Sequence, residues 1–132
     1  YKFKQYKGFE DFGDATFTAD NGAVSYMRVD WLNPDGLGAW GDGRLLVLGT
    51  DGYIEVRKYI DVARSSEGDH VFLVDHKGEH YYNAAGKEGF PFFGRLIRDC
   101  LEKTQTAFSQ QTAFKAIELA IDAQEQAVTV ES

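Results

Sequence analysis

The sequence is poor in several features that would each indicate a definite class of protein. It has a single cysteine, Cys100, in 132 residues, which excludes an internal disulfide and any cysteine-rich zinc site. Basic residues are outnumbered by acidic ones, 14 to 21, and the net charge of −7 disfavours binding to nucleic acid or to an anionic membrane. No apolar run approaches the roughly 18 residues that a membrane-spanning helix needs. We therefore expect a cytoplasmic protein with neither nucleic-acid nor membrane partners.

The residues that are present give the composition of a globular domain. The apolar fraction of 43% over 132 residues is sufficient for an ordinary core, and we predict a single domain over residues 1–132. No signal peptide is recognisable. The chain begins Tyr-Lys-Phe without methionine, so we expect either a processed product or a piece of a longer protein.

The N-terminal two thirds of the chain shows the alternation of apolar and polar residues that is typical of strands. The predicted strands are 15–19, 24–32, 45–48, 53–60, 71–74 and 80–82. Asn21-Gly22 predicts a type I′ hairpin turn, and the short links between strands predict antiparallel pairing. Residues 45–48 are apolar on both sides, which predicts a central strand covered on both faces.

The last third of the chain changes to helical spacing. Pro91 suits the first turn of one helix, and Ser109 suits the N-cap of a second helix that continues towards Val128. Strands followed by helices predict an α+β fold, an open-faced, mostly antiparallel sheet with two C-terminal helices packed on one face. The other face needs a cover, either a partner subunit or a missing domain, and we predict self-association through it. The helix residues expected to be buried are Phe93, Leu96, Ile97, Phe114, Ile117 and Ile121.

Residues 36–41 read Gly-Leu-Gly-Ala-Trp-Gly and match the dinucleotide-binding pattern G-x-G-x-x-G. That motif binds a pyrophosphate only where a helix begins within it. Here the predicted strand over 45–48 comes next instead, and no acidic residue closes a βαβ unit about 20 residues further on. We predict a loop between two strands and no cofactor site in this chain.

Other residues that could carry chemistry have simpler interpretations. We predict surface histidines at 70, 76 and 80, because their spacing crosses a turn and alternates between faces, so no metal site is expected. Cys100 is predicted to be a core thiol and the Phe90–Phe93 cluster to be core at a helix start. No catalytic residue is assigned. The loop Asn33–Gly43, with Trp40 among glycines and Trp31 at its root, is the best candidate for binding, with a subunit contact as the equal alternative.

Several segments, in their order and spacing, resemble one known family. They are Glu10-Asp11-Phe12-Gly13-Asp14-Ala15, Asn21-Gly22-Ala23, Val29-Asp30-Trp31, Leu48-Gly49-Thr50-Asp51-Gly52, the run from Phe93 to Leu101 and the run from Ala113 to Ala120. Over nearly the whole chain the sequence resembles the C-terminal sheet domain of the Gfo/Idh/MocA oxidoreductases, the glucose–fructose oxidoreductase-like group.

The resemblance implies a C-terminal domain of a two-domain enzyme whose N-terminal Rossmann domain binds NAD or NADP. The family's Glu-Lys-Pro and histidine-containing motifs lie upstream of the resembling segment, and this chain has no Lys-Pro pair and no histidine before His70. The resemblance also implies sheets that pack face to face between subunits and a small polyhydroxylated substrate. In the family the corresponding loop helps to line the substrate pocket. The resemblance therefore implies five candidate substrate-binding residues here: Trp31, Asn33, Asp35, Trp40 and Arg44.

Two hypotheses for the function remain. The first is a substrate-binding and oligomerisation domain of an NAD(P)-dependent oxidoreductase acting on a sugar, cyclitol or related polyol, with the chain itself not catalytic. The second is a stand-alone, non-enzymatic α+β module for dimerisation or small-ligand binding. A G-x-G-x-x-G motif and a Lys-Pro pair upstream of Tyr1 would distinguish the first from the second.

Overall fold

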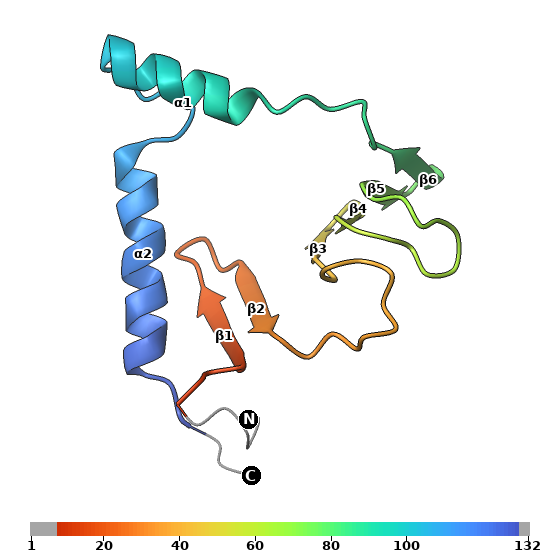
Figure 1. Cartoon of the computed structure of the whole chain (residues 1–132), viewed down its shortest axis with the longest axis horizontal. Helices are drawn as coiled ribbons and strands as arrows, with labels where there is room; N and C mark the ends of the chain where they lie inside the picture. The colour runs from red at the N-terminus through yellow and green to blue at the C-terminus, as the bar shows by residue number, and fades with distance from the viewer. Residues whose placement is uncertain (1–7, 130–132) are drawn as a thin grey trace. The chain divides into compact units, whose positions relative to one another are not determined.

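The computed structural model describes residues 8–129, which form two units. The first unit combines residues 8–32 with residues 90–129, and the second is the continuous segment 33–89. The first unit contains the strands β1 (Phe12–Thr18) and β2 (Val24–Asp30) and the helices α1 (Pro91–Glu102) and α2 (Gln110–Glu125) (Figure 1). The second contains β3 (Arg44–Gly49), β4 (Gly52–Arg57), β5 (His70–Asp75) and β6 (Gly78–Asn83).

The α+β class is confirmed, with antiparallel strands followed by two C-terminal helices. All six strands lie close to the predicted segments, and every neighbouring pair is antiparallel. The strands form two sheets, a β1–β2 hairpin and a four-stranded sheet in the order β3-β4-β5-β6. The 13 residues between β2 and β3, from 31 to 43, carry no regular structure.

The β1–β2 hairpin is present as predicted, but its turn type is different. The carbonyl of Ala19 accepts the amide of Gly22 at 2.8 Å, and Ala19 and Ala23 pair at the neck. Gly22 has a φ of 84°, whereas Asn21 is not in the left-handed region and its side chain accepts the amide of Ala23. A type I′ turn needs positive φ at both central residues, so the prediction of that type is wrong. The geometry is that of a type I turn followed by a left-handed glycine.

The four-stranded sheet has two faces of different chemistry, which the strand register defines because paired residues point to the same face. We call one the aliphatic face: Leu45, Val47, Ile54, Val56, Val71, Leu73, Asp75, His80 and Tyr82. We call the other the mixed face: Arg44, Leu46, Leu48, Tyr53, Glu55, Arg57, His70, Phe72, Val74, Glu79, Tyr81 and Asn83.

Strand β3 is at the edge of this sheet, so the prediction of a central strand covered on both faces is wrong. Within the described residues it pairs only with β4, and residues 45–48 are all exposed, Leu48 by 73%. An apolar pattern on both sides of a strand predicts that both faces are covered, but the pattern does not identify what covers them. Self-association through this sheet therefore stays a prediction.

Both helices begin as predicted. Pro91 occupies the first turn of α1, where its missing amide proton removes no helical hydrogen bond. Ser109 is the N-cap of α2, and its hydroxyl accepts the amide of Thr112 at 3.0 Å. Helix α1 ends at Lys103, which adopts the left-handed conformation with a φ of 55°.

Asp99 organises the corner between the two helices. Its side chain accepts the Thr104 hydroxyl, the Thr106 hydroxyl at 2.8 Å, the Thr106 amide at 2.9 Å and the Ala107 amide at 2.8 Å. These donors, with the Thr104 hydroxyl contributing most, hold the pKa of the Asp99 carboxyl well below its usual range. Asp99 is 6% exposed, so these bonds are shielded from water.

Acid should therefore weaken the α1–α2 corner only at low pH. A carboxyl with a lowered folded pKa contributes its full stabilisation above the unfolded pKa of about 3.9, and loses it as the pH falls towards the folded value. We expect constant helicity from pH 7 to about 4.5, then a decline that Asp99→Asn reduces. Circular dichroism across this range measures it, with Asp122→Asn on the exposed side of α2 as control. Equal acid profiles for Asp99→Asn and the parent would contradict the assigned role.

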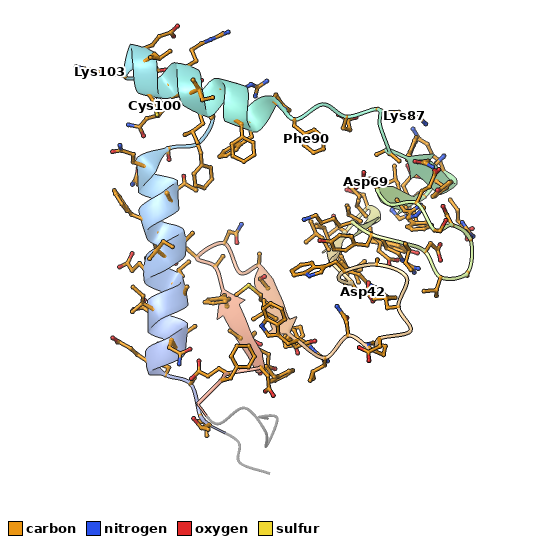
Figure 2. All side chains as sticks on the ribbon, viewed as in Figure 1. Asp42, Asp69, Lys87, Phe90, Cys100 and Lys103 are labelled. Carbon is orange, nitrogen blue, oxygen red and sulfur yellow. The ribbon has the colours of Figure 1, made fainter. Side chains whose placement is uncertain are left out.

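The predicted burial of the helix residues is wrong for this chain. All six are exposed, from 38% at Leu96 to 70% at Phe114, and no apolar residue among 8–129 is fully buried. The predicted core positions of Cys100 and of the Phe90–Phe93 cluster are wrong for the same reason (Figure 2). Helical periodicity identifies the apolar side of a helix correctly, but burial also requires a surface to cover it. Within the described residues nothing covers these side chains.

Candidate functional site

The glycine-rich segment 36–41 lies in the loop between β2 and β3, and no helix begins within it. None of its three glycines has a positive φ. Gly41 is buried, and a β-carbon there would lie 3.3 Å from the Tyr59 ring, so this glycine permits close packing. The prediction of a strand–strand connection is confirmed. The amide donors that a helix N-terminus presents to a pyrophosphate are not formed by this segment.

This chain should accordingly bind no dinucleotide by itself. We expect calorimetric titration of the chain with NADH or NADPH to give no binding tighter than about 100 μM, equivalent to roughly −5.5 kcal/mol. The control is the same titration after Gly38→Ala, which should change nothing. Saturable binding below that concentration would overturn the interpretation of residues 36–41 as a connecting loop.

The five candidate residues lie on one continuous stretch of chain but in different environments. Trp31 belongs to the first unit, where its ring lies 6.1 Å from that of Phe9 and its amide donates to the carbonyl of Asp11 at 2.9 Å. Asn33, Asp35, Trp40 and Arg44 belong to the second unit, and the Trp40 side chain is 81% exposed.

Arg44 is the candidate with the most definite geometry. Its guanidinium forms a two-point ion pair with Asp42, Nε to Oδ1 and Nη2 to Oδ2, both at 2.8 Å. The pair raises the pKa of Arg44 and lowers the pKa of Asp42, chiefly through these hydrogen bonds. Asp42, labelled in Figure 2, lies two residues before Arg44, the first residue of β3, so the pair fixes the end of the loop against the start of the strand. The ionic partner of Arg44 is thus Asp42 and not another of the five candidates.

A second group of polar side chains gathers on the mixed face, and no sequence pattern indicated it. The Arg57 guanidinium lies 5.2 Å from the centre of the Phe72 ring and pairs with Glu55 at 2.7 Å and Asp61 at 3.3 Å. The Arg64 guanidinium lies 5.7 Å from the same ring and 5.9 Å from that of Tyr81. Two guanidinium groups therefore flank one aromatic ring.

The prediction of a surface histidine at position 70 is wrong, because His70 is fully buried. Its Nε2 lies 2.8 Å from the carbonyl oxygen of Glu67, which can only accept, so Nε2 carries the proton. In the neutral ring, Nδ1 then accepts the Tyr81 hydroxyl at 2.7 Å. The ring also stacks on Tyr81, with centres 5.8 Å apart. His70 thus ties the segment before β5 to the sheet. His76 and His80 are exposed, as predicted.

A shallow groove of about 480 Å³ lies beside this group, within the second unit. The glycine-rich loop forms one wall through Gly36, Leu37 and Gly38. The segment from Ile60 to Ser66 forms the other wall and contributes Asp61, Arg64 and two serines. The predicted functional loop therefore lines a hollow, but it does so with residues other than the five candidates.

Two further features of the described residues concern metal binding and membrane spanning. Within residues 8–129, no three histidine, cysteine, aspartate or glutamate side chains converge as a metal site requires. Neither described helix is long and apolar enough to cross a membrane.

Comparison with known proteins gives a similarity among solved structures. No family model matches the chain, and no curated protein sequence matches it. Among solved structures, the chain is similar to the crystal structure of a putative oxidoreductase from Erwinia carotovora atroseptica SCRI1043. The two are 50% identical over 99% of this chain, with a TM-score of 0.93. The chain covers 39% of the length of the Erwinia protein, so it corresponds to part of a longer protein and has an oxidoreductase-related fold.

Proposed function

We propose that this chain is the C-terminal substrate-binding and oligomerisation domain of an NAD(P)-dependent oxidoreductase of the Gfo/Idh/MocA type. The substrate class is a sugar, cyclitol or related polyol. The observation that carries the proposal is the 50% identity over nearly the whole chain to part of a longer protein described as an oxidoreductase. The narrower assignment to the Gfo/Idh/MocA family is supported by the resemblance of the sequence motifs.

The geometry of the loop supports a substrate-binding role for this chain, with the cofactor bound elsewhere in the enzyme. The chain's only G-x-G-x-x-G segment connects two strands, so the dinucleotide site belongs to another part of the enzyme in this proposal. NAD or NADP would be held there, together with the lysine and histidine of the family's catalytic motifs. The residues of this chain would position the substrate, because loops on a rigid sheet are common sites of binding residues.

The five candidates retain their proposed role as substrate contacts. Asp42 engages Nε and Nη2 of Arg44, which leaves Nη1 to donate to a substrate hydroxyl. Trp40 offers a large exposed aromatic surface against which the apolar face of a sugar ring can pack. Asn33 and Asp35 supply amide and carboxylate groups suited to hydroxyl recognition.

Steady-state kinetics of the intact protein tests this function. D-glucose, myo-inositol and D-glucitol are each offered with NAD⁺ or NADP⁺, and reduced cofactor is followed by its absorbance. We expect one polyol to be oxidised, and Trp40→Ala to raise KM at least about tenfold with little change in kcat, as loss of uniform substrate binding predicts. Phe90→Ala, which removes another exposed aromatic, is the control. Reduction of neither cofactor by any polyol would contradict the proposed function.

A further inference from the structure

We propose that the groove between the glycine-rich loop and segment 60–66 binds a small anionic molecule through a carboxylate or phosphate group held by Arg64. This inference goes beyond the proposed function and does not rest on it, since it concerns a groove that none of the five substrate candidates lines. It stands on the groove's volume, on the ionic environment of Arg64 and on the bracing of the surrounding segment.

The groove has the dimensions and lining of a small-molecule site. Its volume of about 480 Å³ lies within the usual range for ligand pockets. Gly36 and Gly38 contribute no side chains, which keeps one wall low, while Leu37 and Ile60 supply apolar surface. Ser65 and Ser66 supply hydroxyl groups.

Arg64 is the feature that selects an anion. Within the described residues its guanidinium forms no ion pair, whereas Arg57 lies between Glu55 and Asp61. The Phe72 and Tyr81 rings hold the Arg64 guanidinium without using its hydrogen-bond donors. A planar guanidinium with free donors matches the two oxygens of a carboxylate or phosphate.

The acidic residue on the same wall does not oppose this assignment. Asp61 is buried, and its Oδ1 forms an ion pair with the Arg57 guanidinium at 3.3 Å and accepts the Ala63 amide at 3.1 Å. Its backbone carbonyl accepts the amides of Arg64 and Ser65. Asp61 therefore shapes the turn that presents Arg64, and its charge is compensated by Arg57.

The wall that carries Arg64 is held in place before any ligand arrives. Asp61 and Ser65 pair at the neck of the turn. His70 holds the end of the segment through the carbonyl of Glu67. A β-carbon at Gly68 would lie 2.8 Å from the carbonyl oxygen of Lys58, so the backbone there approaches its neighbour closely. Such bracing lowers the ordering cost of binding.

Calorimetric titration of the intact protein tests the inference with three probes: D-gluconate, D-glucose 6-phosphate and D-glucitol. We expect at least one anionic probe to bind at least about tenfold more tightly than neutral D-glucitol, because bonds to a charged group are the strong ones. Tighter gluconate binding assigns a carboxylate, and tighter binding of the phosphorylated sugar assigns a phosphate. Equal affinity for all three probes, or binding of none at millimolar concentration, overturns the inference.

Two variants locate the binding. Arg64→Ser should lower the affinity for the anionic probe at least about tenfold, while Arg95→Ser on α1 should leave that affinity unchanged. Gly38→Leu should block the groove without strain, because a β-carbon at position 38 meets only Ile60, at 3.9 Å, and Gly89→Leu is its control. Unchanged affinity in both groove variants would place the anion elsewhere and overturn the inference. Because oxidoreductase activity is not the readout, failure here leaves the proposed function standing.

Discussion

Replacing Gly52 with alanine should destabilise the four-stranded sheet by about 3 kcal/mol or more, the range for severe backbone conflicts. Gly52 opens β4 with a φ of 149°, a conformation that side chains rarely adopt. A β-carbon there would lie 2.1 Å from the carbonyl oxygen of Val74 and 3.0 Å from the Cα of Asp75. Both atoms are backbone of β5, so relief requires β4 and β5 to separate where Gly52 pairs with Asp75. Urea unfolding of the intact protein measures the loss.

Substitutions at two other glycines distinguish the steric overlap with β5 from the backbone strain at position 52. Gly49 pairs with Gly52, but a β-carbon at position 49 meets its nearest atom at an ordinary 3.6 Å, so Gly49→Ala should cost less than about 1 kcal/mol. Gly78 has a similar φ of 154° with open space around it, so Gly78→Ala should be intermediate. Equal losses in the three variants would show that the contact with β5 is not the cause.

Of two adjacent charge substitutions on β3, Val47→Arg and Leu48→Arg, one alone should break self-association. Val47 lies on the aliphatic face and Leu48 on the mixed face, and their side chains are 52% and 73% exposed. In our proposal a second copy covers one face of this sheet, and burying an unpaired guanidinium there is strongly unfavourable. We expect the self-association constant to fall at least about 100-fold in that variant, equivalent to about 2.7 kcal/mol.

Sedimentation of the intact protein at micromolar concentration distinguishes the outcomes. The other substitution should leave association intact, since in our proposal its face takes no part in the contact between the two copies. Val62→Arg, at an exposed position between β4 and β5, is the control for added charge. A soluble monomer before any substitution, or two variants that associate as the parent does, would contradict the proposed oligomerisation role.

The strands and helices were predictable because their signals are local. Alternating or continuous apolar runs between turn residues located the six strands, and proline and serine located the starts of both helices. The turn at Asn21-Gly22 was misassigned because Asn-Gly also suits a type I turn that ends in a left-handed glycine. The position of β3 in its sheet was missed because strand order depends on pairing partners, which a single run of apolar residues does not specify.

The candidate site was only partly predictable. The glycine-rich loop was recognised as a strand connection because a strand, and not a helix, comes after it in the sequence. The group around Phe72 was missed because its members come from β4, β5, β6 and the segment before β5, and only the sheet register brings them together. One signal could have indicated it: His70 and Tyr81 fall on the same face once the short turn at His76-Lys77 fixes the hairpin. Whether the five loop candidates contact substrate stays a prediction.

The division of the chain into a continuous segment and a split unit has a consequence for the order of folding. The sheet of residues 33–89 is a meander in which each strand pairs with its neighbour in sequence, so it forms through short-range contacts. Such contacts close quickly, and the meander can be complete as soon as β6 leaves the ribosome. The unit that combines residues 8–32 with residues 90–129 must wait for α2 and must close a loop that contains the entire finished sheet. The β1–β2 hairpin is therefore synthesised first, but it is the last of the strands to join its complete folded unit.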